Sequence, residues 1–503
     1  MTKPYYITTP LYYVNDKPHI GHAYTNILCD TFARFHRFMG ERVFFLTGTD
    51  EHGEKIDKTA REKGTDNKTF VDVMVPRFKD LWTKLDIQYD YFIRTTDEEH
   101  KKSVQTILEK LYEKGDIYPG KYKGWYCTPC ESFWTKLQLV EGKCPDCKRV
   151  VQEIAEDNYF FKLSKYQDWL IQYIESHPDF IFPESRRNEI LGFLKSPLED
   201  LCISRPRARL SWGIDLPFSK DHVVYVWFDA LSNYITAIGY PGRTNVFSEL
   251  WPADLHMVGK DILRQHAVYW PIMLKSLDLE MPKTVFAHGW WTMEGAKVSK
   301  SVGNVVAPEE LIAKYGLDTL RYFLLREVTL GLDGAYSEDL LVERFNKDLA
   351  NDLGNLVLRT TSMLERYFGG KITVQSSNDS KLKQQSIGAL HIVADDMKLF
   401  DPKGALAAIW VIVTSANKYV EENKPWQLAK ENKMELLGKV LCDLLESIRF
   451  VGIMLAPFMP STSAKICNLF GIEETPSIKM LEWGVLKSGM VIQKGEALFP
   501  RIE

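Results

Sequence analysis

The sequence lacks the features that would place its 503 residues in a membrane or direct them out of the cell. It contains no run of about 18 apolar residues, so no transmembrane helix is expected. It begins MTKPYYI and passes directly into a strand-like segment, without a signal peptide or a transit segment rich in Arg and Ser. We therefore expect a cytoplasmic protein that does not contact a membrane.

An excess of basic charge is also missing, because the net charge is −4 and the isoelectric point is near 6.3. A protein that coats nucleic acid without discrimination carries a basic excess, so that class is excluded. An RNA partner would have to be bound by local basic patches. Internal repeats and low-complexity segments are absent from the sequence as well.

Cysteines are few and unevenly placed. Four of the eight form two close pairs, CTPC at residues 127–130 and CPDC at residues 144–147, with thirteen residues between them. The other four stand singly in apolar surroundings: Cys29, Cys202, Cys442 and Cys467. This distribution indicates core thiols and a metal site in a reducing compartment, not a disulfide framework. The spacing predicts one structural Zn²⁺ held by four thiolates, from Cys127, Cys130, Cys144 and Cys147.

The order of apolar patterns predicts more than one domain, since a chain of this length is too long for a single core. A β-rich run at 5–8, a helix at 19–39 and a strand at 43–46, followed by a loop at 47–50, indicate a parallel α/β sheet. The cysteine-bearing segment interrupts this rhythm, which a strand-like run at 223–228 resumes. After about residue 336, amphipathic helical patterns run nearly to the end.

The sequence HIGH at residues 19–22 lies where the first strand passes into the first long helix. Parallel sheets bind ligands at the carboxyl ends of their strands, and helix N-termini attract phosphate. His19 and His22, with Gly21 allowing close approach, therefore suit the α-phosphate of a nucleotide. Taken alone, they are also consistent with two ordinary surface histidines at a helix start.

The sequence KVSKSVGN at residues 297–304 supplies two lysines and two hydroxyls that can neutralise a departing pyrophosphate. An isolated run of this kind would be a solvated loop. Together with HIGH, in this order and at this separation, it resembles the paired signatures of the class I aminoacyl-tRNA synthetases. Val298 stands where the commonest version of that signature has Met. The resemblance implies catalytic roles for His19, His22, Lys297 and Lys300, and ATP contacts for Gly21, Ser299 and Ser301.

Four further segments are similar to the methionyl-tRNA synthetase family: PLYY at 10–13, TGTDEHG at 47–53, YVWFDA at 225–230, and GKDI at 259–262 with the residues that follow it. The resemblance implies that Asp50 binds the substrate ammonium and that Gly259 and Asp261 approach the ATP ribose. It also implies a methionine pocket formed by Leu11, Tyr13, Trp227, Ala230, Leu231, Tyr234, Ile262, His266 and Trp270. A thioether is soft and polarizable, and Tyr13 and His266 are the expected weak donors to it. Core packing remains an alternative for Ala230, Leu231 and Ile262.

Two polar features elsewhere in the chain have both an RNA-binding and an ordinary interpretation. Asn355 and Arg359 form an i, i+4 pair, and Trp426 follows a proline near a helix start. The resemblance implies that these three side chains read the anticodon, with the Trp ring stacked on an unpaired base. Arg205, Arg207 and Arg209 face either the phosphates of RNA from one side of an extended strand or only solvent.

The family resemblance predicts a methionine–tRNA ligase that uses ATP with Mg²⁺ to form methionyl-adenylate and transfers the methionyl group to the terminal adenosine of its tRNA. The expected architecture is a Rossmann-type catalytic domain (1–115 and 216–295) split by a zinc-knuckle insertion (116–215), then a mobile lysine loop and stem-contact region (296–345) and a helical anticodon-binding domain (346–503). The partners are L-methionine, ATP and tRNA, and a monomer is expected.

Three alternatives compete with this prediction. Other class I synthetases with large editing insertions do not fit, because the roughly hundred residues of the insertion cannot house an editing domain. Small nucleotidyltransferases that share the HIGH signature are short and have no helical module. A catalytically inactive RNA-binding paralogue is disfavoured by the intact His19, His22, Lys297 and Lys300.

Overall fold

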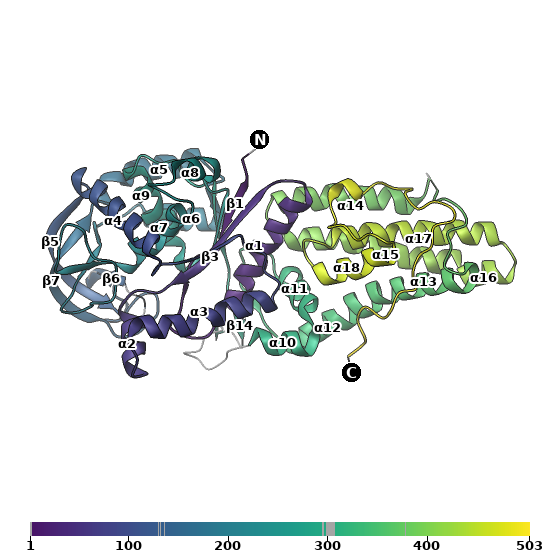
Figure 1. The fold of residues 1–503 in the computed structure, drawn as a ribbon, viewed down its shortest axis with the longest axis horizontal. Coiled ribbons are helices and arrows are strands. Elements are labelled where there is room, and N and C mark those ends of the chain that lie inside the picture. Colours follow the sequence, from purple (N-terminus) through teal and green to yellow (C-terminus); the bar gives the residue numbers. More distant parts are fainter. Residues whose placement is uncertain are drawn as a thin grey trace. The chain divides into compact units, whose positions relative to one another are not determined.

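The computed structural model describes residues 3–128, 130, 132–134, 136–293, 296–297, 307–377 and 379–502. Two compact units are present, one formed by Met1–Cys29 and Val43–Gly289 and the other by Asp30–Arg42 and Trp290–Glu503 (Figure 1). Ser299, Lys300 and Ser301 of the lysine motif lie outside the described residues. No helix in the described parts of the chain is long and apolar enough to cross a membrane.

The first unit is built on a parallel sheet of seven strands, which confirms the predicted fold class. Every ladder in the sheet is parallel, and the strand order is β2-β3-β1-β12-β13-β8, with β4 pairing the other side of β3. The strands are β1 (Tyr5–Thr8), β2 (Tyr12–Tyr13), β3 (Val43–Asp50), β4 (Tyr91–Arg94), β8 (Ile181–Phe182), β12 (Leu255–Gly259) and β13 (Thr284–His288).

Helices connect the strands of this sheet and set its topology. From β1 the chain passes through the first helix to β3 and then to β4, whereas from β12 it moves in the opposite direction to β13. The order of the strands therefore reverses between β1 and β12, and such a switch point is where open α/β sheets bind ligands. The helices are α1 (Ile20–Phe38), α2 (Glu54–Glu62), α3 (Asn67–Lys84), α4 (Glu98–Glu113), α5 (Gln167–Ser176), α6 (Glu184–Phe193), α7 (Val226–Thr236), α8 (Thr244–Leu250) and α9 (Trp270–Ser276).

Two local predictions were wrong. Residues 47–50, expected as a loop, continue strand β3, because β2 and β4 pair with them from both sides. Gly48 permits this pairing, since an added Cβ would lie 2.1 Å from the carbonyl oxygen of Ile93. The apolar run at 223–228 is not a strand of the main sheet, because β11 (His222–Val224) pairs antiparallel with β10 (Ser204–Pro206) and helix α7 begins at Val226. Short apolar runs do not distinguish helix from strand by periodicity.

The cysteine-bearing segment forms an antiparallel sheet of four strands in the order β6-β5-β7-β9. These strands are β5 (Ile117–Cys127), β6 (Ser132–Trp134), β7 (Gln152–Phe161) and β9 (Leu201–Cys202), with short 3₁₀ turns at Lys136–Gln138 and Ser164–Tyr166. Strand β8 lies between β7 and β9 in sequence but pairs with β13 in the main sheet. The segment 116–215 is therefore not wholly separate from the main sheet.

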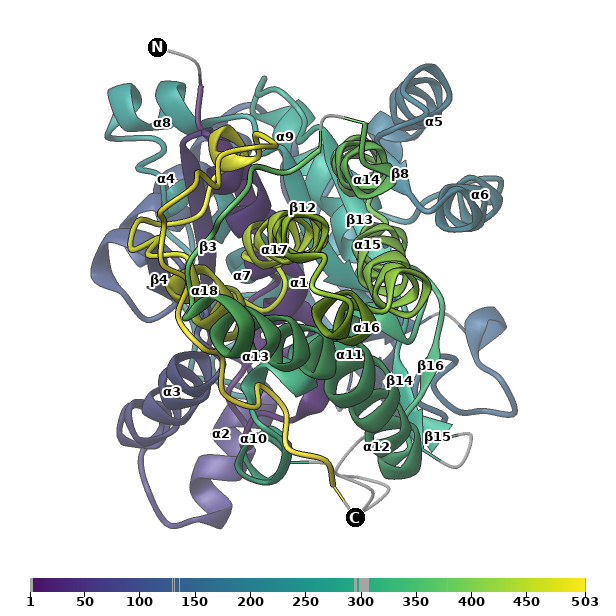
Figure 2. The same cartoon turned by 90° about the vertical axis from the view of Figure 1, so that its right-hand side faces the viewer.

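The second unit is mostly helical, and α14, α15 and α17 run side by side in it (Figures 1 and 2). Its elements are the small sheet β15-β14-β16 (Ala296–Lys297, Trp291–Met293, Gly334–Ala335) and the helices α10 (Pro308–Tyr315), α11 (Leu317–Arg326), α12 (Glu338–Arg344), α13 (Asn355–Phe368), α14 (Lys381–Lys398), α15 (Pro402–Asn423), α16 (Pro425–Lys430), α17 (Met434–Met454) and α18 (Pro460–Leu469). A π-helical segment, η6 (Phe345–Gly354), joins α12 to α13. Beyond α18 the described chain is largely irregular, with a 3₁₀ turn at Ile478–Met480.

Candidate active site and metal centre

The histidines of the HIGH motif cap helix α1 reciprocally. His19 precedes the helix, and its Nδ1 accepts a hydrogen bond from the backbone N–H of Gly21 at 3.1 Å. In return, Nδ1 of His22 accepts from the backbone N–H of His19 at 3.0 Å. The two ring centroids lie 4.0 Å apart. This is a capping box, in which two side chains satisfy backbone donors that the first helical turn leaves without partners.

These two hydrogen bonds fix the tautomer of both rings. A ring nitrogen that accepts from a backbone N–H carries no hydrogen, so each neutral imidazole holds its hydrogen on Nε2. Both rings are half-buried at the start of a 19-residue helix, where the positive end of the helix dipole favours an anion. The arrangement offers a phosphate two Nε2–H donors and a helix N-terminus.

Glycines shape the nucleotide side of the sheet. An added Cβ at Gly21 would lie 3.0 Å from Cε1 of His19, so glycine allows that ring to fold back over the first turn. At the carboxyl end of β12, an added Cβ at Gly259 would lie 2.7 Å from Oδ1 of Asp261, in the 3₁₀ turn Lys260–Ile262. Strand β12 pairs with β1, so Gly259 and Asp261 stand at the switch point of the sheet.

Helix α7, the turn Lys260–Ile262, the π-helical turn η4 (Gln265–Tyr269) and the start of α9 bring five of the predicted methionine contacts together. The ring of Trp227 meets His266 edge to face, with 6.2 Å between centroids. The Tyr234 ring lies 5.7 Å from the rings of both His266 and Trp270. The carbonyl oxygen of Ile262 lies 2.8 Å from Nδ1 of His266. The rings form a packed aromatic cluster in which Tyr234, His266 and Trp270 are buried, and an aromatic environment suits a thioether.

The other predicted methionine contacts lie on α7 and on the sheet. Ala230 and Leu231 are buried in α7, and Leu11 packs against the hydrophobic cluster that contains Leu231. Burial of this kind is expected both of a pocket wall and of ordinary core packing. Tyr13 pairs with Asp50 in the β2–β3 ladder, and Asp50 is 7% exposed at the carboxyl end of β3. The sheet therefore holds a buried acidic side chain beside Tyr13.

Both ring nitrogens of His266 have partners within the protein. Burial lowers the pKa of His266 to about 4, so the ring is neutral near pH 7. Its Nδ1–H donates to the carbonyl of Ile262 at 2.8 Å, and its Nε2 accepts from the Tyr234 hydroxyl at 2.7 Å. No ring hydrogen of His266 is then left to donate to sulfur. In this conformation His266 orients Tyr234 instead of acting as the donor that the sequence predicted.

His256 is a buried member of this cluster that sequence reasoning missed. Its Nε2 accepts from the indole N–H of Trp270 at 3.2 Å, so its Nδ1–H donates to Oγ1 of Thr8 at 2.7 Å. Its ring stacks on Tyr234 with 4.2 Å between centroids, and burial lowers its pKa well below the usual value. The signal in the sequence is a histidine inside an otherwise apolar parallel strand. His256 fixes the positions of Trp270 and Tyr234 from β12.

Glu51 was also missed, although it follows Asp50 directly. It is fully buried, and Arg94 donates to both of its carboxylate oxygens at 2.7 Å. The hydroxyls of Thr49 and Thr96 add hydrogen bonds of 2.6 Å each. A buried carboxylate that accepts four hydrogen bonds is held rigidly, because moving any donor would leave a buried charge with one partner fewer. This network holds the chain immediately after Asp50.

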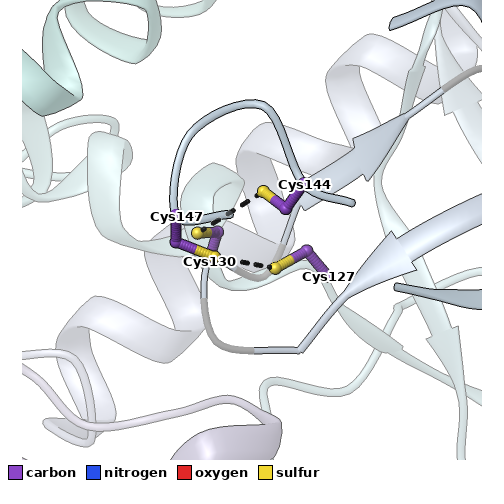
Figure 3. A group of neighbouring side chains, drawn as sticks. All are labelled: Cys127, Cys130, Cys144 and Cys147. Atoms are coloured by element: carbon purple, nitrogen blue, oxygen red, sulfur yellow. Dashed lines mark hydrogen bonds between the residues drawn. The ribbon is translucent and has the colours of Figure 1, made fainter. Parts of the chain in front are cut away.

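Four cysteine sulfurs converge in the insertion, as the spacing predicted (Figure 3). The four Sγ atoms all lie within 4.8 Å of one another, with Cys127 to Cys147 at 3.5 Å and Cys130 to Cys144 at 3.9 Å. Tetrahedral zinc with Zn–S bonds of about 2.3 Å requires sulfurs about 3.8 Å apart. The cluster is therefore suited to bind one zinc ion. The four remaining cysteines are buried free thiols, as expected.

In the second unit, Arg359 of α13 and Trp426 of α16 lie together. The guanidinium carbon of Arg359 is 5.9 Å from the centroid of the Trp426 ring, and Trp426 is 38% exposed. Arg359 also donates to Oε1 of Glu421 at 2.8 Å. Asn355 is exposed one turn before Arg359, where η6 passes into α13. The three predicted anticodon residues thus come from adjacent helices, and both Asn355 and Trp426 face solvent.

Of the three arginines before residue 212, Arg205 fits neither of the two interpretations given to them, whereas Arg207 is partly open to solvent. Arg205 is 2% exposed, and its guanidinium lies over the ring of Tyr225. Arg207 is paired with Asp215, and Arg209 donates to Glu54 at 2.8 Å. The alternation of side chains along a strand could not predict these partners, because they lie on other segments of the chain. The arginines stabilise the junction of the insertion instead of forming a row that meets phosphates.

Comparison with known proteins agrees with this geometry. A family model described as tRNA synthetases class I (M) matches residues 5–155 and 150–361, and a model of the anticodon binding domain of methionyl tRNA ligase matches residues 369–503. The chain belongs to the methionyl-tRNA synthetases. It is therefore a class I aminoacyl-tRNA synthetase, a ligase that joins methionine to tRNA. The other class I synthetases and the small nucleotidyltransferases are excluded as its family.

Curated relatives of this methionyl-tRNA synthetase match nearly all of this chain and about four fifths of their own length. The methionine–tRNA ligase of Caldanaerobacter subterraneus subsp. tengcongensis is 54% identical over all of this chain and 80% of its own, and that of Thermotoga maritima is 49% identical over 99% and 80%. The structure of Mycobacterium tuberculosis methionyl-tRNA synthetase in complex with methionyl-adenylate has a TM-score of 0.95 at 40% identity, covering 99% of this chain and 100% of that one.

Proposed function

We propose that this methionyl-tRNA synthetase forms methionyl-adenylate at the carboxyl edge of its parallel sheet, with His19 and His22 binding the α-phosphate. The methionine carboxylate attacks the α-phosphorus of ATP, and pyrophosphate leaves. The two Nε2–H groups donate to phosphate oxygens as negative charge increases there. The observation that best supports this role is the reciprocal cap, in which both Nδ1 atoms accept backbone hydrogen bonds at 3.0 and 3.1 Å.

Charge on the leaving group is proposed to be neutralised by the lysine motif. Lys300, aided by Lys297 and by the hydroxyls of Ser299 and Ser301, stabilises pyrophosphate as it departs, and Mg²⁺ accompanies the ATP. Gly259 allows the nucleotide to approach the end of β12, where Asp261 binds the ribose. No covalent enzyme intermediate is needed, so catalysis consists of positioning and electrostatics.

Methionine is proposed to bind between the sheet and helix α7. Asp50 binds the ammonium group, which fits its buried position at the carboxyl end of β3. The side chain extends along Trp227, Tyr234 and Trp270, with Leu11, Ala230, Leu231, Ile262 and His266 completing the pocket. Because His266 donates to Ile262, Tyr13 is the remaining proposed donor to the sulfur.

Transfer to tRNA is proposed to use the rest of the chain. Cys127 at the end of β5, Cys130 in the turn after it, and Cys144 and Cys147 in a second turn would hold one structural Zn²⁺, in the insertion near the acceptor end. Asn355 and Arg359 read the anticodon, and the exposed ring of Trp426 stacks on an unpaired base. The proposed division keeps residues 1–115 and 216–295 for adenylation and 346–503 for the anticodon. As a translation enzyme, the protein is proposed to work in the cytoplasm.

Amino-acid-dependent exchange of pyrophosphate into ATP, measured with all twenty amino acids, tests the proposed function. Methionine should be the preferred substrate, and Lys300→Ala should raise the barrier of adenylation by about 2–4 kcal/mol while leaving the KM for methionine nearly unchanged. Lys418→Ala is the matched control, because that side chain is 77% exposed on α15 and should leave exchange unaltered. Absence of exchange in the wild type would indicate the catalytically inactive paralogue. Equal losses in rate and methionine affinity would remove Lys300 from the transition state.

A further inference from the structure

A buried carboxylate in helix α7 joins two histidines that the proposed mechanism does not use. Oδ2 of Asp229 lies 2.7 Å from Nδ1 of His52, and Oδ1 lies 2.7 Å from Nε2 of His100. The second nitrogen of His100 lies 2.7 Å from Oγ1 of Thr236. Asp229, His52 and His100 are between 1% and 3% exposed. These three titratable side chains are thus shielded from water and linked to one another by hydrogen bonds.

The protonation states in this group follow from its geometry. Burial alone would raise the pKa of Asp229, but His52 and His100 on either side hold it below its usual value. The carboxylate is therefore ionised and can only accept, so Nδ1 of His52 and Nε2 of His100 both donate. An ionised, doubly bonded carboxylate fixes both ring orientations, because rotating either ring would leave a buried charge with one partner fewer.

The residues around this group carry the proposed methionine contacts. His52 comes two positions after Asp50, in the turn between β3 and α2. Asp229 lies between Trp227 and Ala230 on α7. The hydrogen bond between His52 and Asp229 is thus a direct link between the segment that carries the ammonium-binding carboxylate and the helix that forms the side-chain wall.

His100 extends the same link to a third element. It stands in the first turn of α4, and its two bonds join that helix to both ends of α7, at Asp229 and Thr236. The edge of Trp212 packs against the His52 ring with 5.2 Å between centroids, and its indole N–H donates to the backbone carbonyl of Glu51 at 2.6 Å. The turn that follows Asp50 is therefore held from two sides, by Trp212 and by the ionised carboxylate of Asp229.

We propose that Asp229 is a positioning residue for methionine, which acts through His52 and His100 to set the distance between Asp50 and the aromatic wall on α7. The proposal rests on the methionine site described under the proposed function. A substrate bound at both its ammonium and its side chain senses that distance, whereas ATP, proposed to bind through the HIGH motif, Gly259 and Asp261, contacts neither Asp50 nor the wall on α7.

Asp229→Asn is the variant that tests the link. Asparagine has nearly the same shape, but its single oxygen can accept from only one of the two histidines, so the other ring must either rotate or take the tautomer that accepts from the amide. Displacing a binding group by about an ångström is costly for positioned substrates, and we expect the KM for methionine in pyrophosphate exchange to rise about tenfold. The KM for ATP should stay within about twofold, and the fraction of active sites found by adenylate burst titration should stay near that of the wild type.

Asp116→Asn is the matched control for loss of a buried carboxylate. Asp116 is fully buried and accepts from Lys165, Tyr166 and Ser276 at 2.5, 2.6 and 2.7 Å, in the same compact unit. It contacts no proposed methionine residue through these bonds. Its replacement should lower the thermal midpoint of the protein without a selective change in the KM for methionine.

A second pair of variants keeps the test decisive if Asp229→Asn folds poorly. His100→Gln keeps an N–H that can donate to Asp229, and His100→Ala removes it, so only the alanine variant should raise the KM for methionine. Equal KM values for methionine in wild type, Asp229→Asn and His100→Ala would overturn the proposal. So would a parallel rise in the KM for ATP, which indicates general distortion. Methionine-dependent exchange by the wild type is measured in the same series. Its absence would contradict the proposed function, whereas unchanged KM values in the variants would contradict only the role of Asp229.

Discussion

His266 should make the stability of the catalytic unit depend on pH between 5 and 7. Burial lowers its pKa from 6.5 to about 4, because a charged imidazole would be removed from water, and the hydrogen bond to the carbonyl of Ile262 opposes this shift only in part. The unfolded chain therefore binds this proton at a higher pH than the folded protein does. The stabilisation is fully present above about pH 6.5 and is lost as the pH falls toward about 4.

The size of the effect follows from the same two values. The gap between 6.5 and about 4 corresponds to at most about 3 kcal/mol. Over the accessible interval from pH 7 to pH 5, the linkage relation gives a loss of about 2 kcal/mol from this one ring. No reduction for solvent screening is needed, since His266 is 1% exposed.

Urea unfolding at a series of pH values, compared between the wild type and His266→Gln, measures this contribution. Glutamine does not titrate, so carboxylates and histidines that do not interact with His266 cancel in the difference between the two proteins. The wild type should lose about 2 kcal/mol more than the variant between pH 7 and pH 5. Because the chain has two compact units, the transitions are fitted as separate steps. Parallel pH profiles for the two proteins would refute the assignment of His266 as a neutral, doubly bonded ring.

Three further predictions concern the other sites. Protein prepared without chelator should contain one zinc per chain by elemental analysis, and Cys144→Ser should lose the metal and the local order of the insertion; metal-free wild type would contradict this. Trp426→Ala should raise the KM for tRNA while sparing methionine-dependent pyrophosphate exchange, with Trp426→Phe as the control that keeps a stacking ring; an equal fall in exchange would make it a core residue. Norleucine and selenomethionine should both be activated, and Tyr13→Phe should narrow the preference for methionine over norleucine, worth about 1–3 kcal/mol in the wild type, without improving leucine. An unchanged methionine/norleucine ratio in that variant would remove Tyr13 from the sulfur site.

Local spacing was enough to predict the elements and sites whose parts lie close together in sequence. The helix expected at 19–39 is α1, Ile20–Phe38, since its apolar residues recur at helical spacing and Gly40 ends it. The cysteine cluster was predicted because each of two short turns brings two sulfurs close together. The HIGH motif was placed at a helix start for the same reason. Its role as a reciprocal cap was not foreseen, because that depends on ring rotamers.

Pairing partners decided the segments that local patterns misassigned. Residues 47–50 are strand because β2 and β4 lie on either side of them, and neither neighbour is encoded within the run itself. The run at 223–228 divides between β11 and α7, since Tyr225 is extended at the helix start and the following residues pack as a helix. Arg205 was expected on a surface and is buried over Tyr225.

The sequence by itself determined the family, the four cysteines of the cluster and the candidate residues of the active site, because each is carried by a short motif. Only the tertiary structure decided which of those residues touch. Asp229 stands 177 residues from His52 and 129 from His100, and Trp270 reaches His256 across the turn between β12 and α9. Hydrogen bonds at such separations fix tautomers and ring orientations. No periodicity in the chain encodes them, because they form only after the sheet has brought the carboxyl ends of its strands to one edge.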